Sequence, residues 1–334
     1  MKYLPVCLPN DQKNRYSHFM FRRLLIILSI LLCFHAQSAS NLKVLTLNLG
    51  AIMPFSSGTS ARIEKFCKDI QDKNYDVILL QEVWISSYRE LVKQKCAFDY
   101  SLDLDEKSGL TRNIERERVK STSLKLINYI LSSFSNHLGL DSGLLILSKY
   151  KLENPKRLIF SQSGDEQYIF DGESFVSKGA IGATIKHPKF GKLFVATTHL
   201  VSDYVDHSYQ EQKKQQLTEL ALWFKTNSGT KKSILGGDFN ISPPSDKRRR
   251  HLNTSNLWEN LKNNYLKDFA RLNSDFSDLT TFPGSGNDDD EGVVDHLFGL
   301  GGIVPLRGDI ILKNGVSDHY GFEVIFGTKD FSLF

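Results

Sequence analysis

The chain lacks a long hydrophobic run. Its most apolar stretch, residues 24–34, has 11 residues, whereas a helix that crosses a membrane needs about 20. Arg22 and Arg23 precede this stretch, and small residues at 36–40 follow it. A basic start, a short apolar centre and a small-residue end are typical of a secretory signal peptide. We therefore expect residues 1–40 to be an N-terminal extension with a signal peptide, and the protein to be secreted or periplasmic.

An excess of charge of one sign is also missing. Lys and Arg number 42 and Asp and Glu 38, and without residues 1–40 there are 37 of each sign. Binding to nucleic acid depends on a basic surface that neutralises phosphates, so this balance speaks against a nucleic-acid partner. One basic run, residues 247–251, can contact phosphates or an anionic membrane, but we favour a solvated loop.

Cysteine is scarce, with four in the chain. Cys7 and Cys33 lie in the expected leader, so Cys67 and Cys96 would remain after export to an oxidising compartment. Both belong to predicted helices that flank one strand, and we predict that they form a disulfide. Two separate buried thiols are equally compatible with the sequence.

Internal repeats, low-complexity tracts and long linkers are absent from residue 42 onward, which indicates a single domain over residues 41–334. Short β-type runs alternate there with amphipathic segments, as in a mixed α/β fold. The clearest strand-like runs are 44–47, 77–80, 144–147, 193–196 and 322–326.

Two segments have apolar residues at the helical spacing i, i+3, i+4, i+7, namely 63–70 and 217–224. Ser208, followed three residues later by Glu211, fits a capping box that would start the second helix. We expect residues 100–141 to be a surface excursion from the core.

Several β-type runs finish on a polar residue that can bind a metal or a phosphate. Strand ends hold side chains rigidly while leaving them open to a cleft, as a preorganised site requires. Taken singly, each such residue is more simply a turn residue, but the ordered set predicts one site. Its motifs are Leu47-Asn48, Gln81-Glu82-Val83, Thr198-His199, Gly237-Asp238-Phe239-Asn240 and Ser317-Asp318-His319.

This ordered set resembles the endonuclease/exonuclease/phosphatase superfamily, which includes deoxyribonucleases, abasic-site endonucleases, inositol polyphosphate phosphatases and sphingomyelinases. The resemblance covers residues 42–326. It implies a four-layered α/β/β/α sandwich with two mixed β-sheets packed face to face. It also implies metal-dependent hydrolysis of a phosphoric ester.

The expected roles follow from what phosphodiester hydrolysis requires, which is a neutralised phosphoryl group and an activated water. Glu82 is expected to bind Mg²⁺, with Asn48 and Asp318 in the metal shell, and Mn²⁺ or Co²⁺ as replacements. Asp238 is the candidate base or water-orienting group. Asn240, two residues later on the same side of an extended chain, is expected to contact the phosphate or hold the water.

The histidines His199 and His319 are expected to donate hydrogen bonds to phosphoryl oxygens, with a neighbouring carboxylate keeping such a histidine protonated. The resemblance implies that Asp295 is this partner of His319. His296 follows Asp295 in a strand, faces the opposite way and is expected to be structural. Lys178 is implied to lie near the phosphate, although a surface lysine in a hairpin is an equal alternative.

Within the superfamily, local motifs resemble the neutral sphingomyelinase branch. They are Gln81-Glu82-Val83-Trp84, the run at 142–149, Ser177-Lys178-Gly179-Ala180 and Ser317-Asp318-His319-Tyr320-Gly321. The expected function is hydrolysis of sphingomyelin to ceramide and phosphocholine by a monomer at a phospholipid membrane surface, which residues 53–55 and the stretch around Tyr129 would contact. The alternatives are a nuclease or phosphoinositide phosphatase of the same fold, and a catalytically silent binding or toxin-accessory module.

Overall fold

The computed structural model describes residues 41–51, 58–103, 142–162, 164–165, 168, 173, 176–204, 207–229, 231–243, 255–260, 280–284 and 291–328. All of them belong to one compact unit, Asn41–Phe334. The expected leader, nearly all of the excursion, both candidate membrane contacts and the basic run 247–251 lie outside the described residues.

The described strands form two mixed sheets. The six-stranded sheet has the order β10-β11-β1-β2-β4-β3 and the five-stranded sheet the order β5-β6-β7-β8-β9. The pairs β1–β2 and β7–β8 are parallel, and the others are antiparallel. The first sheet contains β1 (Leu42–Asn48), β2 (Val77–Gln81), β3 (Tyr100–Asp103), β4 (Leu145–Ser148), β10 (Ile303–Ile311) and β11 (Gly321–Thr328). The second contains β5 (Glu153–Ile159), β6 (Gly179–His187), β7 (Gly191–His199), β8 (Ser233–Asp238) and β9 (Asp295–Leu300).

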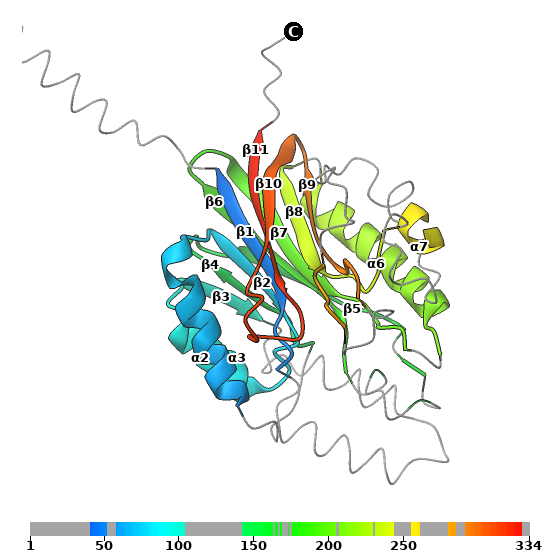
Figure 1. Ribbon diagram of the computed structural model, residues 1–334. Helices are drawn as coiled ribbons and strands as arrows, with labels where there is room; N and C mark the ends of the chain where they lie inside the picture. The colour runs from blue at the N-terminus through cyan, green and yellow to red at the C-terminus, as the bar shows by residue number, and fades with distance from the viewer. Residues whose placement is uncertain are drawn as a thin grey trace, which may run out of the picture. The chain divides into compact units, whose positions relative to one another are not determined.

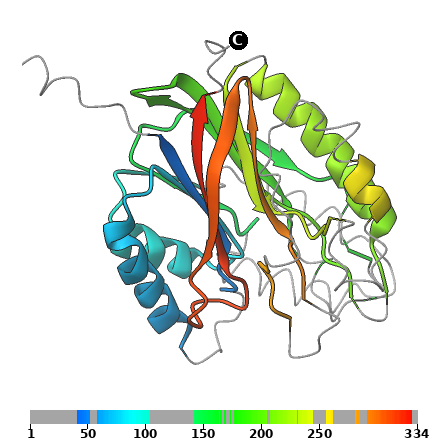
Figure 2. The same ribbon diagram turned by 45° about the horizontal axis from the view of Figure 1, so that its top comes forward.

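Helices cover the outer face of each sheet (Figures 1 and 2). On the first sheet lie α2 (Thr59–Ile70), continued by the short η1 (Gln71–Lys73), and α3 (Ser86–Lys95). On the second lie α6 (Gln210–Ser228) and α7 (Ser255–Asn260). The four layers confirm the predicted α/β/β/α sandwich.

The inner strands are apolar on both faces because each sheet is covered on both sides. In β2, Val77 and Leu79 belong to the core between the two sheets. Ile78 and Leu80, which alternate with them, belong to the core beneath α2 and α3. This double burial explains why the strand-like runs of the sequence were continuous apolar stretches.

The start of α6 differs from the predicted capping box. The helix begins at Gln210, and no side chain caps it. The Ser208 hydroxyl instead donates to Asp203 Oδ1 at 3.2 Å, and the backbone N–H of Tyr209 donates to the same oxygen at 2.8 Å. A carboxylate from the preceding loop therefore takes the place of the predicted Ser208 and Glu211 pair.

A disulfide joins Cys67 of α2 to Cys96, which directly follows α3. The structure thus confirms the predicted pairing of these cysteines. Within the described part of the chain, no helix has the length and apolar character needed to cross a membrane.

Candidate active site

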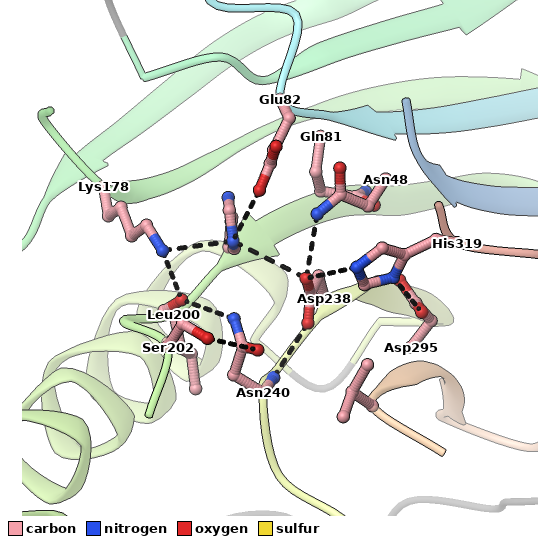
Figure 3. A network of polar contacts seen from close by, with 12 residues as sticks. Asn48, Gln81, Glu82, Lys178, Leu200, Ser202, Asp238, Asn240, Asp295 and His319 are labelled. Atoms are coloured by element: carbon pink, nitrogen blue, oxygen red, sulfur yellow. Dashed lines mark hydrogen bonds and ion pairs between the residues drawn. The ribbon is translucent and has the colours of Figure 1, made fainter. Parts of the chain in front are cut away.

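The strand ends of both sheets meet in one cluster of polar side chains (Figure 3). The parallel strands β1 and β2 place Asn48 opposite Gln81, the residue before Glu82. In the second sheet, His199 at the end of β7 pairs with Asp238 at the end of β8. Asn48 Nδ2 donates to Asp238 Oδ2 at 3.0 Å, so a direct hydrogen bond joins the ends of the two sheets.

Asp238 is the centre of this cluster and is buried. Besides the bond from Asn48, its Oδ2 lies 3.6 Å from His199 Nε2 and 3.9 Å from His319 Nε2. Its Oδ1 accepts the backbone N–H of Asn240 at 2.9 Å. The hydrogen bonds from Asn48 and Asn240 hold this carboxylate in one orientation, as a base or a water-orienting group requires.

His319 and Asp295 form a buried pair, with Nδ1 and Oδ2 2.9 Å apart. Burial acts to lower the pKa of His319, but the Asp295 carboxylate and the charges of Asp238 and Asp318 outweigh it and raise the pKa to about 10. Burial raises the pKa of Asp295 to about 6, against the opposing charge of His319. The raised pKa of His319 favours its imidazolium form at neutral pH.

His199 is in the opposite electrostatic state. Burial, followed by the charges of Lys178 and His319, holds its pKa well below the usual range. A lysine ammonium can only donate, so the 3.1 Å contact from Lys178 Nζ makes His199 Nε2 an acceptor. A carboxylate partner that favours the protonated ring is therefore found at His319, whereas burial and the Lys178 charge favour the neutral ring at His199.

Lys178 lies directly before β6 and is buried rather than on the surface. Its Nζ also donates to Glu173 Oε1 at 2.8 Å and to the backbone carbonyl of Leu200 at 2.9 Å. An ammonium has three N–H groups, and these three contacts occupy all of them. A direct bond from Lys178 to a phosphate would require one of these partners to be exchanged.

Glu82 follows β2 in a left-handed backbone conformation, with φ of 57°, which is uncommon outside glycine. Burial raises the pKa of its carboxyl to about 7. Its Oε1 lies 3.8 Å from Nε2 of His199, whose pKa is held well below its usual range. The Glu82 side chain is 16% exposed and has no ion pair with a lysine or arginine among the described residues, so a bound cation would stabilise its ionised form.

The other two expected metal ligands lie at the same edge. Asn48 Oδ1 accepts the N–H of Gly50 at 3.0 Å. A Cβ at Gly50 would come within 2.7 Å of Asp318 Oδ1, and the Asp318 charge acts to raise the pKa of Glu82. Carboxylate and amide oxygens suit a hard divalent ion such as Mg²⁺, so the donor set of Glu82, Asn48 and Asp318 fits the metal that the sequence predicts.

A second group of possible metal ligands is Asp238, Asp295 and His319, whose ligand atoms lie within 4.8 Å of one another. Metal binding requires a neutral imidazole, and without a metal the Asp295 carboxylate raises the pKa of His319 and favours its protonated form. The Nδ1–Oδ2 contact also suits a metal-ligating histidine, whose second ring N–H commonly donates to a carboxylate. This group is therefore a second candidate cation site.

Asn240 also has a left-handed backbone, with φ of 49°. Its Nδ2 donates to the Leu200 carbonyl at 3.0 Å, and its Oδ1 accepts the Ser202 hydroxyl at 3.3 Å. His296, by contrast, points away from the cluster, since its Nε2 contacts the carbonyl of Ile241 at 2.8 Å and its ring packs against aromatic side chains. The structural position predicted for His296 is confirmed.

Residues 45–319 match the sequence profile of the Endonuclease/Exonuclease/phosphatase family. The chain belongs to this family. Family members of this kind are phosphoric ester hydrolases, as the resemblance of the strand-end motifs implied.

Among individual proteins, the chain is 26% identical over 270 residues to a putative neutral sphingomyelinase of Drosophila melanogaster, covering 78% of this chain and 52% of the relative. It is 23% identical over 213 residues to an inositol phosphosphingolipids phospholipase C of Schizosaccharomyces pombe, covering 63% and 43%. The chain thus spans about half the length of these relatives. A crystal structure of a Staphylococcus aureus beta toxin mutant with bound magnesium ions has a TM-score of 0.57 and 17% identity, covering 86% of this chain and 99% of the toxin, and it supports the shared fold.

Sequence reasoning missed several residues that support this family site. Thr281 Oγ1 accepts the backbone N–H groups of Val294 and Asp295, at 2.9 and 3.1 Å, and no motif marks it. Glu173, the partner of Lys178, is likewise unmarked. A signal did exist for Lys213, because it lies four residues before Leu217 on the apolar face of the predicted helix, where a lysine needs an explanation.

Proposed function

We propose that the chain is a divalent-metal-dependent phosphodiesterase that hydrolyses the headgroup phosphodiester of a membrane sphingolipid. With sphingomyelin as substrate, the products are ceramide and phosphocholine. The observation that carries this proposal is the cluster around Asp238, where a protonated His319, a neutral His199 and the Glu82 carboxylate converge. The sphingolipid substrate is supported by the names of the two relatives.

Glu82, with Asn48 and Asp318, would hold the metal, which we propose is Mg²⁺, with Mn²⁺ or Co²⁺ as replacements. When bound, the ion would neutralise charge on the phosphoryl oxygens. The magnesium ions of the beta-toxin structure support this choice. The Glu82 carboxyl supports it independently, because its pKa is raised to about 7 and a bound cation would favour its ionised form.

The remaining residues have distinct proposed roles. Asp238 would orient the attacking water and accept its proton, since its oxygens already receive hydrogen bonds from Asn48 and Asn240. His319 would donate to a phosphoryl oxygen through Nε2, because Asp295 occupies Nδ1. Asn240 would contact the phosphate or the water.

Lys178 and His199 would also act on the phosphoryl group. Lys178 would bias the site toward an anionic phosphate by its charge, and His199 would contact the phosphoryl group after the Lys178 contact at Nε2 is exchanged. Positive charge and hydrogen-bond donors placed near the phosphoryl oxygens stabilise the charge that builds up there in the transition state.

Secretion or a periplasmic location is part of this proposal. It is supported by the signal-like segment within residues 1–40 and by the Cys67–Cys96 disulfide, because disulfides persist in oxidising compartments. We propose that the exported domain acts as a monomer at a phospholipid membrane surface without a nucleic-acid partner.

The test is a substrate panel with Mg²⁺ and with excess chelator. Purified protein is incubated separately with vesicles of sphingomyelin, phosphatidylcholine or an inositol phosphosphingolipid, with a phosphoinositide, and with plasmid DNA. We expect Mg²⁺-dependent release of the headgroup phosphate ester from sphingolipids, fastest from sphingomyelin, and none from the Asp238→Asn variant above background. Preference for DNA or the phosphoinositide would overturn the substrate class, and full activity in chelator would overturn the metal mechanism.

A further inference from the structure

Helix α6 contains a lysine that is fully buried although helix faces usually present lysines to water. The side chains of Lys213 and Asp203 are both 0% exposed, and the ammonium forms an ion pair with Asp203 Oδ2. Lys213 Nζ also donates to the backbone carbonyl of Asn240 at 2.8 Å. Apolar residues of similar size often stabilise a fold as well as a buried ion pair does, so this pair calls for an explanation other than stability.

The Asn240 peptide is the point where this ion pair meets the candidate active site. Its left-handed φ of 49° is unfavourable for a residue with a side chain, although asparagine tolerates it better than most. The side-chain amide of Asn240 is oriented by Leu200 and Ser202, and its N–H by Asp238 (Figure 3). Lys213 donates to the Asn240 carbonyl. Each polar group of Asn240 therefore has a hydrogen-bond partner, and together these bonds fix the orientation of the residue.

Asp203 ties the lysine to the loop that follows β7. Its Oδ1 accepts the Tyr209 N–H at 2.8 Å and the Ser208 hydroxyl at 3.2 Å at the start of α6. The ion pair therefore joins three segments, namely the loop after His199, the first turns of α6 and the loop after Asp238. The first and the third of these segments directly follow strand ends that carry candidate catalytic side chains.

We infer that the Lys213–Asp203 ion pair is a positioning device, which holds the Asn240 peptide in its left-handed conformation and so aims the Asn240 amide at the reacting phosphate. This inference rests on the proposed function. Lys213 touches neither the phosphate nor the water, so it acts through Asn240. Removing the lysine should lower kcat more than it weakens substrate binding, because a misplaced amide loses contacts that form in the transition state.

The first experiment compares Lys213→Met with Leu220→Ala, a core substitution on the same helix, in the full chain. Lys213→Met is expected to lower kcat by about 10- to 100-fold, as supporting hydrogen bonds do in other sites, with KM within about threefold. Leu220→Ala is expected to lower Tm with kcat unchanged at temperatures where it is folded. Equal kcat values for Lys213→Met and wild type would overturn the inference.

Stability and positioning are separated by a charge-neutral double variant, Asp203→Asn with Lys213→Met. It leaves no unpaired buried charge, and the amide oxygen introduced by Asp203→Asn would still accept the Tyr209 N–H. Its Tm is expected to recover relative to Lys213→Met alone, while kcat stays low because the Asn240 carbonyl still lacks its donor. Recovery of kcat together with Tm would show a purely structural role.

A double-mutant cycle with Asn240→Ala tests whether Lys213 acts through Asn240. In the Asn240→Ala background, Lys213→Met should lower kcat by less than about threefold, since coupled residues are not additive. Independent, multiplicative losses would contradict the inference.

Hydrogen exchange of the peptide that contains Asn240 gives a readout without substrate, and it should speed up in Lys213→Met but not in Leu220→Ala. If wild-type protein hydrolyses none of the panel substrates, the proposed function fails, and the exchange result still decides this inference.

Discussion

At the scale of single residues, the candidate site sets two histidines in opposite protonation states. Asp295 and Asp238 raise the pKa of His319 to about 10 despite its burial, whereas burial and then the Lys178 charge hold the pKa of His199 well below its usual range. Environments that push two similar groups apart in pKa usually assign them different chemical tasks. In the proposed mechanism, His319 would donate to developing negative charge, and His199 would contact the phosphoryl group.

The first prediction concerns the metal ligand Glu82. Glu82→Gln keeps the side-chain size but removes the charge that would bind the ion, so we expect at least about a 100-fold loss of activity, larger than the loss on removing a supporting residue. The fold should survive, because in metal-free protein the substitution removes a charge that is only partly exposed to water. Activity is measured on sphingomyelin vesicles over a Mg²⁺ titration, and Tm in chelator.

The matched control is Glu90→Gln on the outer helix α3, where the side chain is 59% exposed and pairs with Lys93. It makes the same chemical change at an exposed surface ion pair and should behave as wild type in both assays. Wild-type activity in Glu82→Gln would mean that Glu82 is not a ligand.

The second prediction concerns His319. His319→Ala should lower kcat by about two to four orders of magnitude, the range of acid–base and oxyanion groups. Asp295→Asn should cause a smaller loss, because the ring keeps an acceptor at Nδ1 but loses the charge that favours its cation. Initial rates with saturating vesicles measure both effects, with His187→Asn as a histidine control outside the site. Equal rates for His319→Ala and wild type would show that the role is misassigned.

At the scale of elements, the sequence predicted those features that depend on local pattern. The apolar runs at 77–80 and 193–196 lie in β2 and β7, and the amphipathic segment at 217–224 lies in α6. The polar residues at the strand ends could be expected to meet, because β1 and β2, and β7 and β8, are parallel pairs. The superfamily resemblance supplied the stacking of the two sheets.

What the sequence could not predict depends on contacts between distant segments. Lys178 lies in a hairpin in sequence terms, but its partners Glu173, His199 and Leu200 are only apparent once β6 and β7 pair. The predicted capping box failed for the same reason, because Asp203 reaches the start of α6 from outside the helix. Local motifs are overridden wherever a tertiary partner binds more strongly.

The third prediction concerns the hairpin of β6 and β7. His187 ends β6, is buried, and accepts the Lys189 N–H at Nδ1. Burial lowers its pKa below the ordinary value of 6.5, so the folded protein binds a proton at His187 less readily than the unfolded chain. This histidine therefore stabilises the fold above pH about 6.5, and that contribution is lost as the pH falls toward its lowered pKa.

His187→Asn keeps an acceptor for the Lys189 N–H but does not titrate. The pH is lowered from about 7.5 to about 5, a range that spans the ordinary histidine pKa. Over this range, Tm of wild type should fall further than Tm of the variant. Thermal unfolding followed by circular dichroism measures both curves, and Lys186→Gln on the same strand serves as a control that should follow wild type. Parallel curves for wild type and His187→Asn would contradict the assignment.

The fourth prediction concerns the bridge between α2 and α3. The Cys67–Cys96 disulfide closes a loop with a sequence separation of 29 residues, so replacing both cysteines by alanine should lower the free energy of unfolding by about 2–4 kcal/mol. Activity at moderate temperature should persist, because Glu82 is anchored by β2. Denaturant unfolding measures the change, and peptide mapping of unreduced protein should recover the linked peptides. Two alkylatable thiols at these positions would refute the pairing.

At the scale of the whole molecule, the main feature is a charge balance, since 37 basic and 37 acidic residues follow residue 40. A domain without net charge gains little from long-range attraction to an anionic surface. Its binding to a membrane would then depend on short-range contacts of apolar side chains and on headgroup recognition in the site. The basic run 247–251 is the exception, because its cations would be attracted to an anionic membrane surface.

The final prediction follows from this balance. On vesicles of sphingomyelin and phosphatidylcholine, activity should change by less than about threefold between about 50 and 300 mM salt, because screening acts on net charge that the domain lacks. Adding anionic lipid should not raise it. If the four cations at 247–250 docked on the membrane, each would contribute about 1 kcal/mol, and binding would weaken steeply with salt. A variant with glutamine at all four positions distinguishes these cases, with a soluble phosphodiester reporting any effect of salt on the site itself. A steep salt dependence in wild type that the variant abolishes would identify the run as a membrane contact, whereas equal and shallow profiles would identify it as a solvated loop.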